Sequence, residues 1–352
     1  MKQVTVEVPA RCIGLDLSDE KSSFCMIDGH GHITCEGQVE TSEPALHQVF
    51  GQLDASRIVL EASPQCHWIA RLLRSLGHEV IVINPRRLQL IHESASKTDR
   101  NDARMLARVA RLDVSLLQPV HEKTPETLAT RTQMRARAQL IHARTCLINL
   151  VRNSMKTFGC KAPSCGTDVF AKKVHALVPE ILRPALEPVL RILTHLQAEI
   201  EGYDKAVAQH CDARSNPTAV FLGLHGVGPV LALAFVTAIE DPRRFKSSRT
   251  VGAYFGLTRK RAQSGKTDPH LRISKEGDRT VRSLLVTAAT HIVRPSAPDS
   301  DLKRYGQRIA RHGSKRDRAR ARVAVARKLA VLMHRLWLTG EVYEPLRASQ
   351  AA

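Results

Sequence analysis

The stretch RIVLEASPQCHWIARLLRSLGHEVIVINP, residues 57–85, contains the pattern that decides the fold of this chain. Residues 57–63 are a short apolar run that is typical of a buried strand. Residues 64–77 repeat apolar side chains at helical spacing and end in glycine, and residues 78–85 form a second apolar run that a proline stops. This alternation of strand and helix predicts an α/β unit.

The residues on either side extend the same pattern. Strands are predicted at 12–18, 22–28 and 32–40, and the sequence GHGH forms a tight turn between the second and third. A helix is predicted at 43–53, and another contains residues 102–112. Three hairpin-linked strands followed by strand–helix alternation predict a mixed sheet with helices on its faces.

Strand signals stop near Thr124. Residues 124–159 and 179–210 each predict a long helix, and together they indicate a helical hairpin or coiled coil that RSNPT, 214–218, ends. The remainder is mainly helical. The predicted domains are therefore an α/β domain at 10–115, a hairpin or coiled-coil linker at 120–212, and a basic helical domain at 216–345.

Positive charge is concentrated in the last third of the chain. The net charge is +19, and residues 241–352 hold 26 Lys and Arg against 9 Asp and Glu. Such asymmetry predicts a polyanionic partner, most simply a nucleic acid. A solvated basic tail is the alternative, but apolar helical stretches at 280–293 and 323–337 indicate that this region folds.

Several classes of protein are disfavoured by composition. No apolar run approaches the ~20 residues of a membrane span, and the first residues lack the apolar core of a signal peptide. The eight cysteines contain no CxxC pair, so we expect reduced thiols in a cytoplasmic protein, with neither a disulfide framework nor a zinc site.

Four carboxylates occur where a sheet edge can collect them. Asp16 lies on the first strand and Glu61 on the fourth, while Asp99 and Asp102, three residues apart, lie at or near the start of a helix after the fifth strand. Strand ends and a following helix start can converge at one edge of a sheet. Carboxylate oxygens suit Mg²⁺ or Mn²⁺, and two such ions about 3.5–4 Å apart can clamp a reacting phosphodiester.

Each acid also has a plainer explanation. Asp16 and Glu61 can be strand-end carboxylates that face solvent, and Asp99 can cap its helix while the dipole favours Asp102 in the first turn. The nearby Lys97, Arg100 and Arg104 would favour a polyanionic substrate. The order of the elements favours the joint interpretation.

A serine in a basic loop is the second candidate for chemistry. Ser264 precedes Gly265 in the predicted loop 256–270. Its basic neighbours, which would hold a phosphate and stabilise charge developing on it, are Arg259, Lys260, Arg261 and Lys266. A serine beside a glycine is otherwise an ordinary turn residue.

Three further segments are candidates for phosphate contacts. Gly226 and Gly228 in HGVGP resemble the hairpin of a helix-hairpin-helix element, although an ordinary turn between helices has the same composition. Residues 314–328 are the densest basic stretch, and Lys275 and Arg282 flank the start of a predicted helix.

The motifs taken together resemble a known family. IGLDLS, VLEAS, VINPRR and KTDRNDARMLA, and later LHGVGPVLALAFV, RRFKSSRTVGAYFGLTRKRAQSG and ISKEGDRTVRSLLVTAA, resemble the DEDD transposases of the insertion-sequence-110 family over roughly residues 12–340. The resemblance implies a RuvC-like form of the ribonuclease H-like fold, then a helical hairpin or coiled coil, then a mainly α transposase domain with a helix-hairpin-helix-like element.

The resemblance also implies roles. The family's four acids fall on Asp16, Glu61, Asp99 and Asp102 as metal ligands, and its nucleophilic serine falls on Ser264. It implies a covalent serine–DNA intermediate, a homo-oligomer (dimer or tetramer) and a structured guide RNA. One departure is Ser63-Pro64, where relatives often have Thr-Gly or Ser-Gly after the glutamate.

Three functions remain open from sequence. The first is a transposase that cleaves and rejoins DNA with Mg²⁺ or Mn²⁺ and a serine nucleophile. The second is a RuvC-like junction nuclease that hydrolyses DNA without a covalent intermediate. The third is a nucleic-acid-binding relic without turnover. Metal-dependent cleavage separates the third from the others, and a trapped protein–DNA adduct separates the first two.

Overall fold

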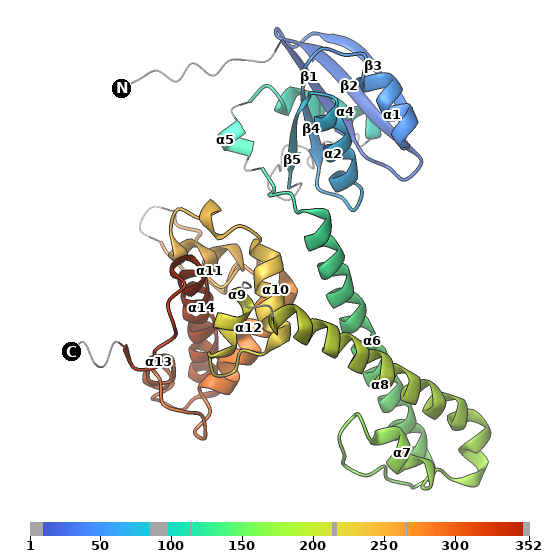
Figure 1. Ribbon diagram of the computed structural model, residues 1–352, viewed down its shortest axis with the longest axis vertical. Coiled ribbons are helices and arrows are strands. Elements are labelled where there is room, and N and C mark those ends of the chain that lie inside the picture. Colours follow the sequence, from blue (N-terminus) through green and yellow to red (C-terminus); the bar gives the residue numbers. More distant parts are fainter. Residues whose placement is uncertain are drawn as a thin grey trace. The chain divides into compact units, whose positions relative to one another are not determined.

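The chain forms two compact units, Met1–Thr124 and Pro125–Ala352, drawn from blue to green and from green to red in Figure 1. The computed structural model describes residues 10–84, 98–112, 114–117, 119–212, 217–264, 267–269 and 271–347. The expected end of the α/β part falls close to the division between the units. The helical hairpin and the basic last third, predicted as separate domains, lie in one unit.

The first unit is built on a five-stranded mixed sheet in the order β3-β2-β1-β4-β5. Its strands are β1 (Arg11–Asp16), β2 (Lys21–Asp28), β3 (Ile33–Glu40), β4 (Arg57–Glu61) and β5 (Glu79–Ile83). Strand β2 runs antiparallel to β1 and β3, whereas β1, β4 and β5 are parallel. The predicted mixed sheet is confirmed, and its order is consistent with an α/β domain of the ribonuclease H-like type.

Helices cover both faces of this sheet. Helices α1 (Glu43–Phe50) and α2 (Cys66–Ser75) bury Leu46, Phe50 and Ile69 with alternate strand residues on one face. Helix α4 (Asp99–Val109) packs on the other face, and the short α5 (Val114–Leu117) follows it. The side-chain alternation of a strand therefore divides the residues of β1 and β4 between two buried layers.

The second unit begins with a helical hairpin. Helix α6 (Pro125–Thr157) and helix α8 (Arg183–Asp212) pack together, as the two predicted long helices require. The segment between them contains α7 (Phe170–His175) and a 3₁₀ turn η2 (Glu180–Leu182), which were not predicted. Regular coiled-coil packing of the hairpin stays a prediction.

The rest of this unit is helical. It comprises α9 (Pro217–Leu222), α10 (Pro229–Ile239), η3 (Pro242–Arg244), η4 (Ser248–Thr250), α11 (Val251–Tyr254), α12 (Arg279–Ile292), α13 (Asp301–Ile309) and α14 (Lys315–Thr339). Helix α10 is almost entirely buried at the centre of the core. Met134 of α6 and Val207 of α8 pack beside its Leu233, which attaches the hairpin to the core.

Two expectations about chain class can be compared with this structure. All eight cysteines are free thiols. Among the described residues, no helix combines the length and the apolar character that crossing a membrane requires.

Candidate functional site

The first two predicted acids end neighbouring parallel strands. Asp16 is the last residue of β1 and Glu61 the last of β4, one position beyond the paired residues Leu15 and Leu60. Both side chains are half-buried. Cys12 and Val59 lie in the layer beneath α4, so alternation places Asp16 and Glu61 toward the same face as that helix.

A close approach of backbones sets the position of α4 on β1. A Cβ atom on Gly14 would lie 2.1 Å from the Ala103 oxygen and 2.2 Å from the Ala107 nitrogen. At the far end of the helix, Arg57 at the start of β4 donates to the Ala110 carbonyl at 3.4 Å. Helix α4 therefore runs antiparallel to β1 and β4, and its first turn lies at the edge where those strands end.

The other two acids occupy that first turn. Thr98 is the N-cap, because its hydroxyl accepts from the Asn101 nitrogen. The alternative in which Asp99 caps the helix is therefore wrong. Asp99 is exposed and Asp102 is half-buried next to Ala103. We call Asp16, Glu61, Asp99 and Asp102 the acidic edge.

An ion-pair cluster fastens α4 to the sheet. Glu36 of β3, whose side chain is 11% exposed, accepts from Arg100 at 2.6 Å and from Arg104 at 2.9 Å. Hydrogen bonds from Arg104, and then from Arg100, lower the pKa of Glu36 to about 2 despite its burial. Two of the cations expected to attract a polyanion thus bind a carboxylate of their own unit; the third, Lys97, lies outside the described residues.

The acidic edge has the donor chemistry of a hard-metal site. Carboxylate oxygens are what Mg²⁺ and Mn²⁺ prefer. Ser63, two residues after Glu61, has a buried hydroxyl without a hydrogen-bond partner among the described residues. Within the described ranges, however, no three His, Cys, Asp or Glu side chains lie close enough to hold a metal ion. The four acids suit a divalent cation by their chemistry and by their position at one edge of the sheet. That they come close enough together to bind one ion stays a prediction.

Ser264 lies in the loop that the sequence predicted, and isolated antiparallel bridges pair the two arms of this loop. The backbones of Ser264 and Thr267 exchange hydrogen bonds of 3.1 and 3.0 Å, and Arg259 bridges to Ile273 in antiparallel fashion. The Lys260 nitrogen also bonds to the Arg272 oxygen at 3.0 Å. We call residues 256–275 the serine ribbon. Ser264 is exposed near its tip, where a substrate can reach the hydroxyl.

The predicted cations around the serine differ in their contacts. Lys260 and Arg261 are exposed, whereas Arg259 forms an ion pair with Asp268 at 2.6 Å. Lys266 lies outside the described residues. The two exposed cations are the ones best placed to meet a phosphate.

The base of the ribbon is compact. Arg282 donates to the carbonyls of Phe255 at 3.2 Å and Glu276 at 2.7 Å, a structural role that its sequence position did not reveal. Lys275 is exposed and adopts a left-handed φ of 58°. A Cβ on Gly277, with φ +68°, would lie 1.9 Å from the Tyr254 oxygen, so the chain crosses itself here at backbone contact.

The two glycines of HGVGP have different surroundings. Gly226 has φ +83°, and a Cβ there would meet the Ala288 oxygen of α12 at 2.9 Å. Gly228 is the N-cap of α10 and nothing lies within 4 Å of its Cβ position. The turn between α9 and α10 therefore leaves an accessible helix start at Gly228, while Gly226 serves close packing.

Sequence reasoning missed the residue that ties the ribbon to the long helix. Asp278, the N-cap of α12, accepts from the nitrogens of Thr280 and Val281 and forms an ion pair with Arg131 of α6 at 2.6 Å. These hydrogen bonds lower its pKa although burial opposes them. An aspartate directly before an apolar helix is a capping signal, so the cap could have been predicted from sequence. The ion pair could not, because Arg131 lies 147 positions away and no local pattern connects the two residues.

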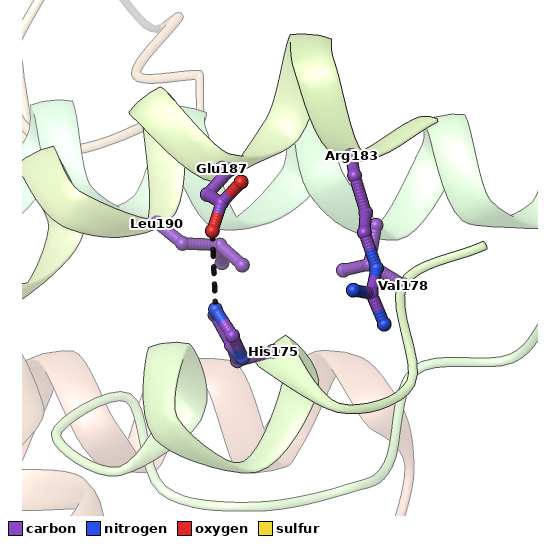
Figure 2. Close-up of a pocket in the computed structure, with 5 residues that line it drawn as sticks. All are labelled: His175, Val178, Arg183, Glu187 and Leu190. Carbon is purple, nitrogen blue, oxygen red and sulfur yellow. Dashed lines mark ion pairs between the residues drawn. The ribbon is translucent and has the colours of Figure 1, made fainter. Parts of the chain in front are cut away.

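A small crevice between α7 and α8 carries no chemistry. Figure 2 shows His175 facing Glu187 across it, 3.5 Å apart, with Arg183 beside them. Its volume is about 10 Å³, which is room for about one water molecule.

Comparison with known proteins identifies the family. Residues 13–159 match the DEDD transposase family of IS110 elements, and residues 219–307 match the transposase IS116/IS110/IS902 family. A probable family 20 transposase of Pseudomonas aeruginosa is 31% identical over 83% of this chain and 86% of its own length. The transposase for insertion sequence element IS1111A of Coxiella burnetii is 27% identical over 95% of this chain and 91% of its own.

These matches span both units, and they agree with the α/β sheet whose edge carries the acids. The chain belongs to the IS110 family of transposases, enzymes that cleave DNA and transfer its strands.

Proposed function

We propose that this transposase uses the acidic edge as its metal site and Ser264 as the nucleophile that attacks DNA. The observation that carries the first part is the convergence of the ends of β1 and β4 with the start of α4, which Gly14 makes possible. The second part is supported by an exposed hydroxyl on a ribbon with exposed cations beside it.

The acids have separate tasks in this proposal. A DEDD-type transposase domain depends on divalent metal ions in general. Asp16, Glu61 and Asp102 would hold the cation, and the exposed Asp99 would complete its shell. When bound, the metal neutralises negative charge on a reacting phosphodiester. Glu36 keeps Arg100 and Arg104 in place, so α4 holds its two acids at the edge.

The serine step is a transesterification. The Ser264 oxygen bonds to phosphorus as its proton leaves, the bond from phosphorus to one deoxyribose oxygen breaks, and that oxygen gains a proton. Lys260 and Arg261 stabilise the charge that develops on the phosphate. The product is a serine–DNA ester that a second strand end can resolve, which allows rejoining without an external energy source.

The DNA contacts extend beyond the serine. Gly228 offers an open helix start to a phosphate, and Lys275 is exposed at the end of the serine ribbon. The resemblance to the family adds a structured guide RNA, which would select the target, and assembly as a dimer or tetramer.

Strand transfer between labelled DNA ends tests this function. We expect activity with Mg²⁺ or Mn²⁺, none in EDTA, and loss of activity in Asp16→Asn, Glu61→Gln and Ser264→Ala proteins that keep the wild-type melting profile. Asp54→Asn, which removes an exposed carboxylate of the first unit outside the acidic edge and the serine ribbon, is the control and should remain active. Cleavage that persists in Ser264→Ala would favour the hydrolytic junction nuclease, and activity in EDTA would exclude the metal site.

A further inference from the structure

An open groove lies in the second unit between the end of α12, helix α13 and the first half of α14. Its volume is about 760 Å³. We call it the α12–α14 groove; its lining residues are Thr290, Val293, Arg294, Pro295, Gly306, Gln307, Ala310, Gly313, Lys315, Arg318, Ala321 and Arg322. None of them belongs to the acidic edge or to the serine ribbon.

The charge of this groove is of one sign. Its four ionisable lining residues are the cations Arg294, Lys315, Arg318 and Arg322. Across the part of the chain that the structure describes, none of the four side chains forms an ion pair or a hydrogen bond. Four unneutralised cations around one cavity attract an anion with several charges.

Helix α14 strengthens this attraction. Arg318 and Arg322 are four residues apart, so they lie side by side on one helical face. The helix begins at the groove, with Ser314 as its N-cap, and its dipole favours negative charge there. Asp317, the nearest acid on α14, is held by the Ser314 hydroxyl at 2.6 Å.

The floor of the groove indicates which polyanion fits. Val293, Pro295, Ala310 and Ala321 give the lining an apolar part, against which the carbon atoms of a sugar can lie. The lining includes no aromatic ring on which a base could stack. Because the enzymes of this family cleave DNA, DNA is the sugar–phosphate polyanion that we assign to the groove.

We infer that the α12–α14 groove binds the sugar–phosphate backbone of DNA, independently of base sequence and apart from the serine ribbon. This inference rests on the proposed function in so far as DNA is the substrate. The groove contacts position the duplex and carry no sequence information. It is a second anchoring site, so the DNA remains bound while one of its phosphodiesters is broken elsewhere.

Two double variants of the full chain on the same helix test the groove. Arg318→Gln with Arg322→Gln removes two charges from it. Arg316→Gln with Arg327→Gln removes two exposed charges from the opposite side of α14 and is the matched control. Binding of a 20-bp DNA duplex is measured in EDTA at several salt concentrations, where no strand is cut.

We expect the groove variant to bind about 10- to 100-fold more weakly at low salt and to lose about 1.8 from the slope of log affinity against log salt. The control should stay within about twofold. Gln307→Glu, which adds a negative charge to the groove without removing a cation, should weaken binding in the same direction. Equal effects of the two double variants would overturn the inference, since long-range charge would then explain both.

An RNA duplex of the same sequence tests the choice of DNA. The groove substitutions should weaken DNA binding more than RNA binding; an equal or larger loss for RNA would overturn the assignment to DNA. Because binding in EDTA does not depend on Ser264 or on a metal, failure of the groove inference and failure of the proposed chemistry are separate results.

Discussion

The acidic edge and the serine ribbon are stabilised by different kinds of contact. The edge is fixed by a buried sheet, by the contact of Gly14 with α4 and by the Glu36 ion pairs. The ribbon is held by a few backbone hydrogen bonds and by the crossing at Gly277, and Ser264 is exposed.

This difference fits the roles that we propose for the two regions. Carboxylates brought together repel one another, so a rigid core must hold them. A nucleophile that approaches DNA benefits from access and from limited movement. We therefore expect packing changes to destroy the edge by unfolding it, and ribbon changes to displace Ser264 while the core remains folded.

The largest effect is expected for Gly14→Ala. The new Cβ would overlap two backbone atoms of α4 at about 2 Å, so the helix must shift and the first unit should lose about 3 kcal/mol or more of stability. Chemical denaturation measures this loss. Gly29→Ala is the control, because its nearest atom is 4.0 Å away, and it should change stability by less than about 0.5 kcal/mol. A stable Gly14→Ala protein would show that α4 does not depend on this contact.

The second effect concerns the base of the ribbon. Gly277→Ala adds a Cβ 1.9 Å from the Tyr254 oxygen at φ +68°, which should cost the second unit about 2–3 kcal/mol and abolish strand transfer. Gly340→Ala has a similar φ of +66° with nothing within 4 Å, so it should cost about 1 kcal/mol and remain active. Equal losses of stability in the two variants would mean that the positive φ alone explains the result, and that the backbone contact of Gly277 with Tyr254 contributes nothing.

The third effect comes from Glu36. Because the pKa of Glu36 is about 2, below its ordinary value of 4.5, its ion pairs stabilise the first unit above pH 4.5 and fail as the pH falls toward 2. Glu36→Gln should lower the stability of the first unit by about 2 kcal/mol at neutral pH. The variant should also lack the fall in stability that the wild type shows as the pH drops from 4.5 toward 2. Unfolding curves at pH 7, 4.5 and 3 measure it. Glu40→Gln on the same strand should keep the wild-type pH dependence.

The smallest effect is expected at His334 in the core of the second unit. Its ring bonds to the Ser248 hydroxyl and the Pro242 carbonyl, both at 2.9 Å, and burial lowers its pKa below 6.5. The unfolded chain therefore takes up a proton more readily, so stability should fall below pH 6.5 by at most about 1.4 kcal/mol per pH unit. His334→Gln should flatten this dependence, whereas His312→Gln on an exposed turn should leave it unchanged.

Sequence periodicity predicted the sheet and the long helices because burial dictates both. An isolated glycine inside an apolar strand, such as Gly14, indicates that another backbone approaches closely. The sequence does not show which helix makes that approach. The loop at 256–270 could be predicted from its composition, but its internal pairing could not, because that pairing depends on close backbone contacts at Gly256 and Gly277. Partners such as Arg131 and Asp278 lie too far apart in sequence for any local pattern to join them.

Trapping the covalent intermediate tests the central claim most directly. Full-length protein is incubated with labelled DNA ends and Mg²⁺, denatured, digested and mapped by mass spectrometry, with Ser264→Ala in parallel. We predict one DNA-modified peptide that contains Ser264, absent from the variant and from samples in EDTA. Metal-dependent cleavage with no adduct, or an adduct on another residue, would contradict the assignment of Ser264 as the nucleophile.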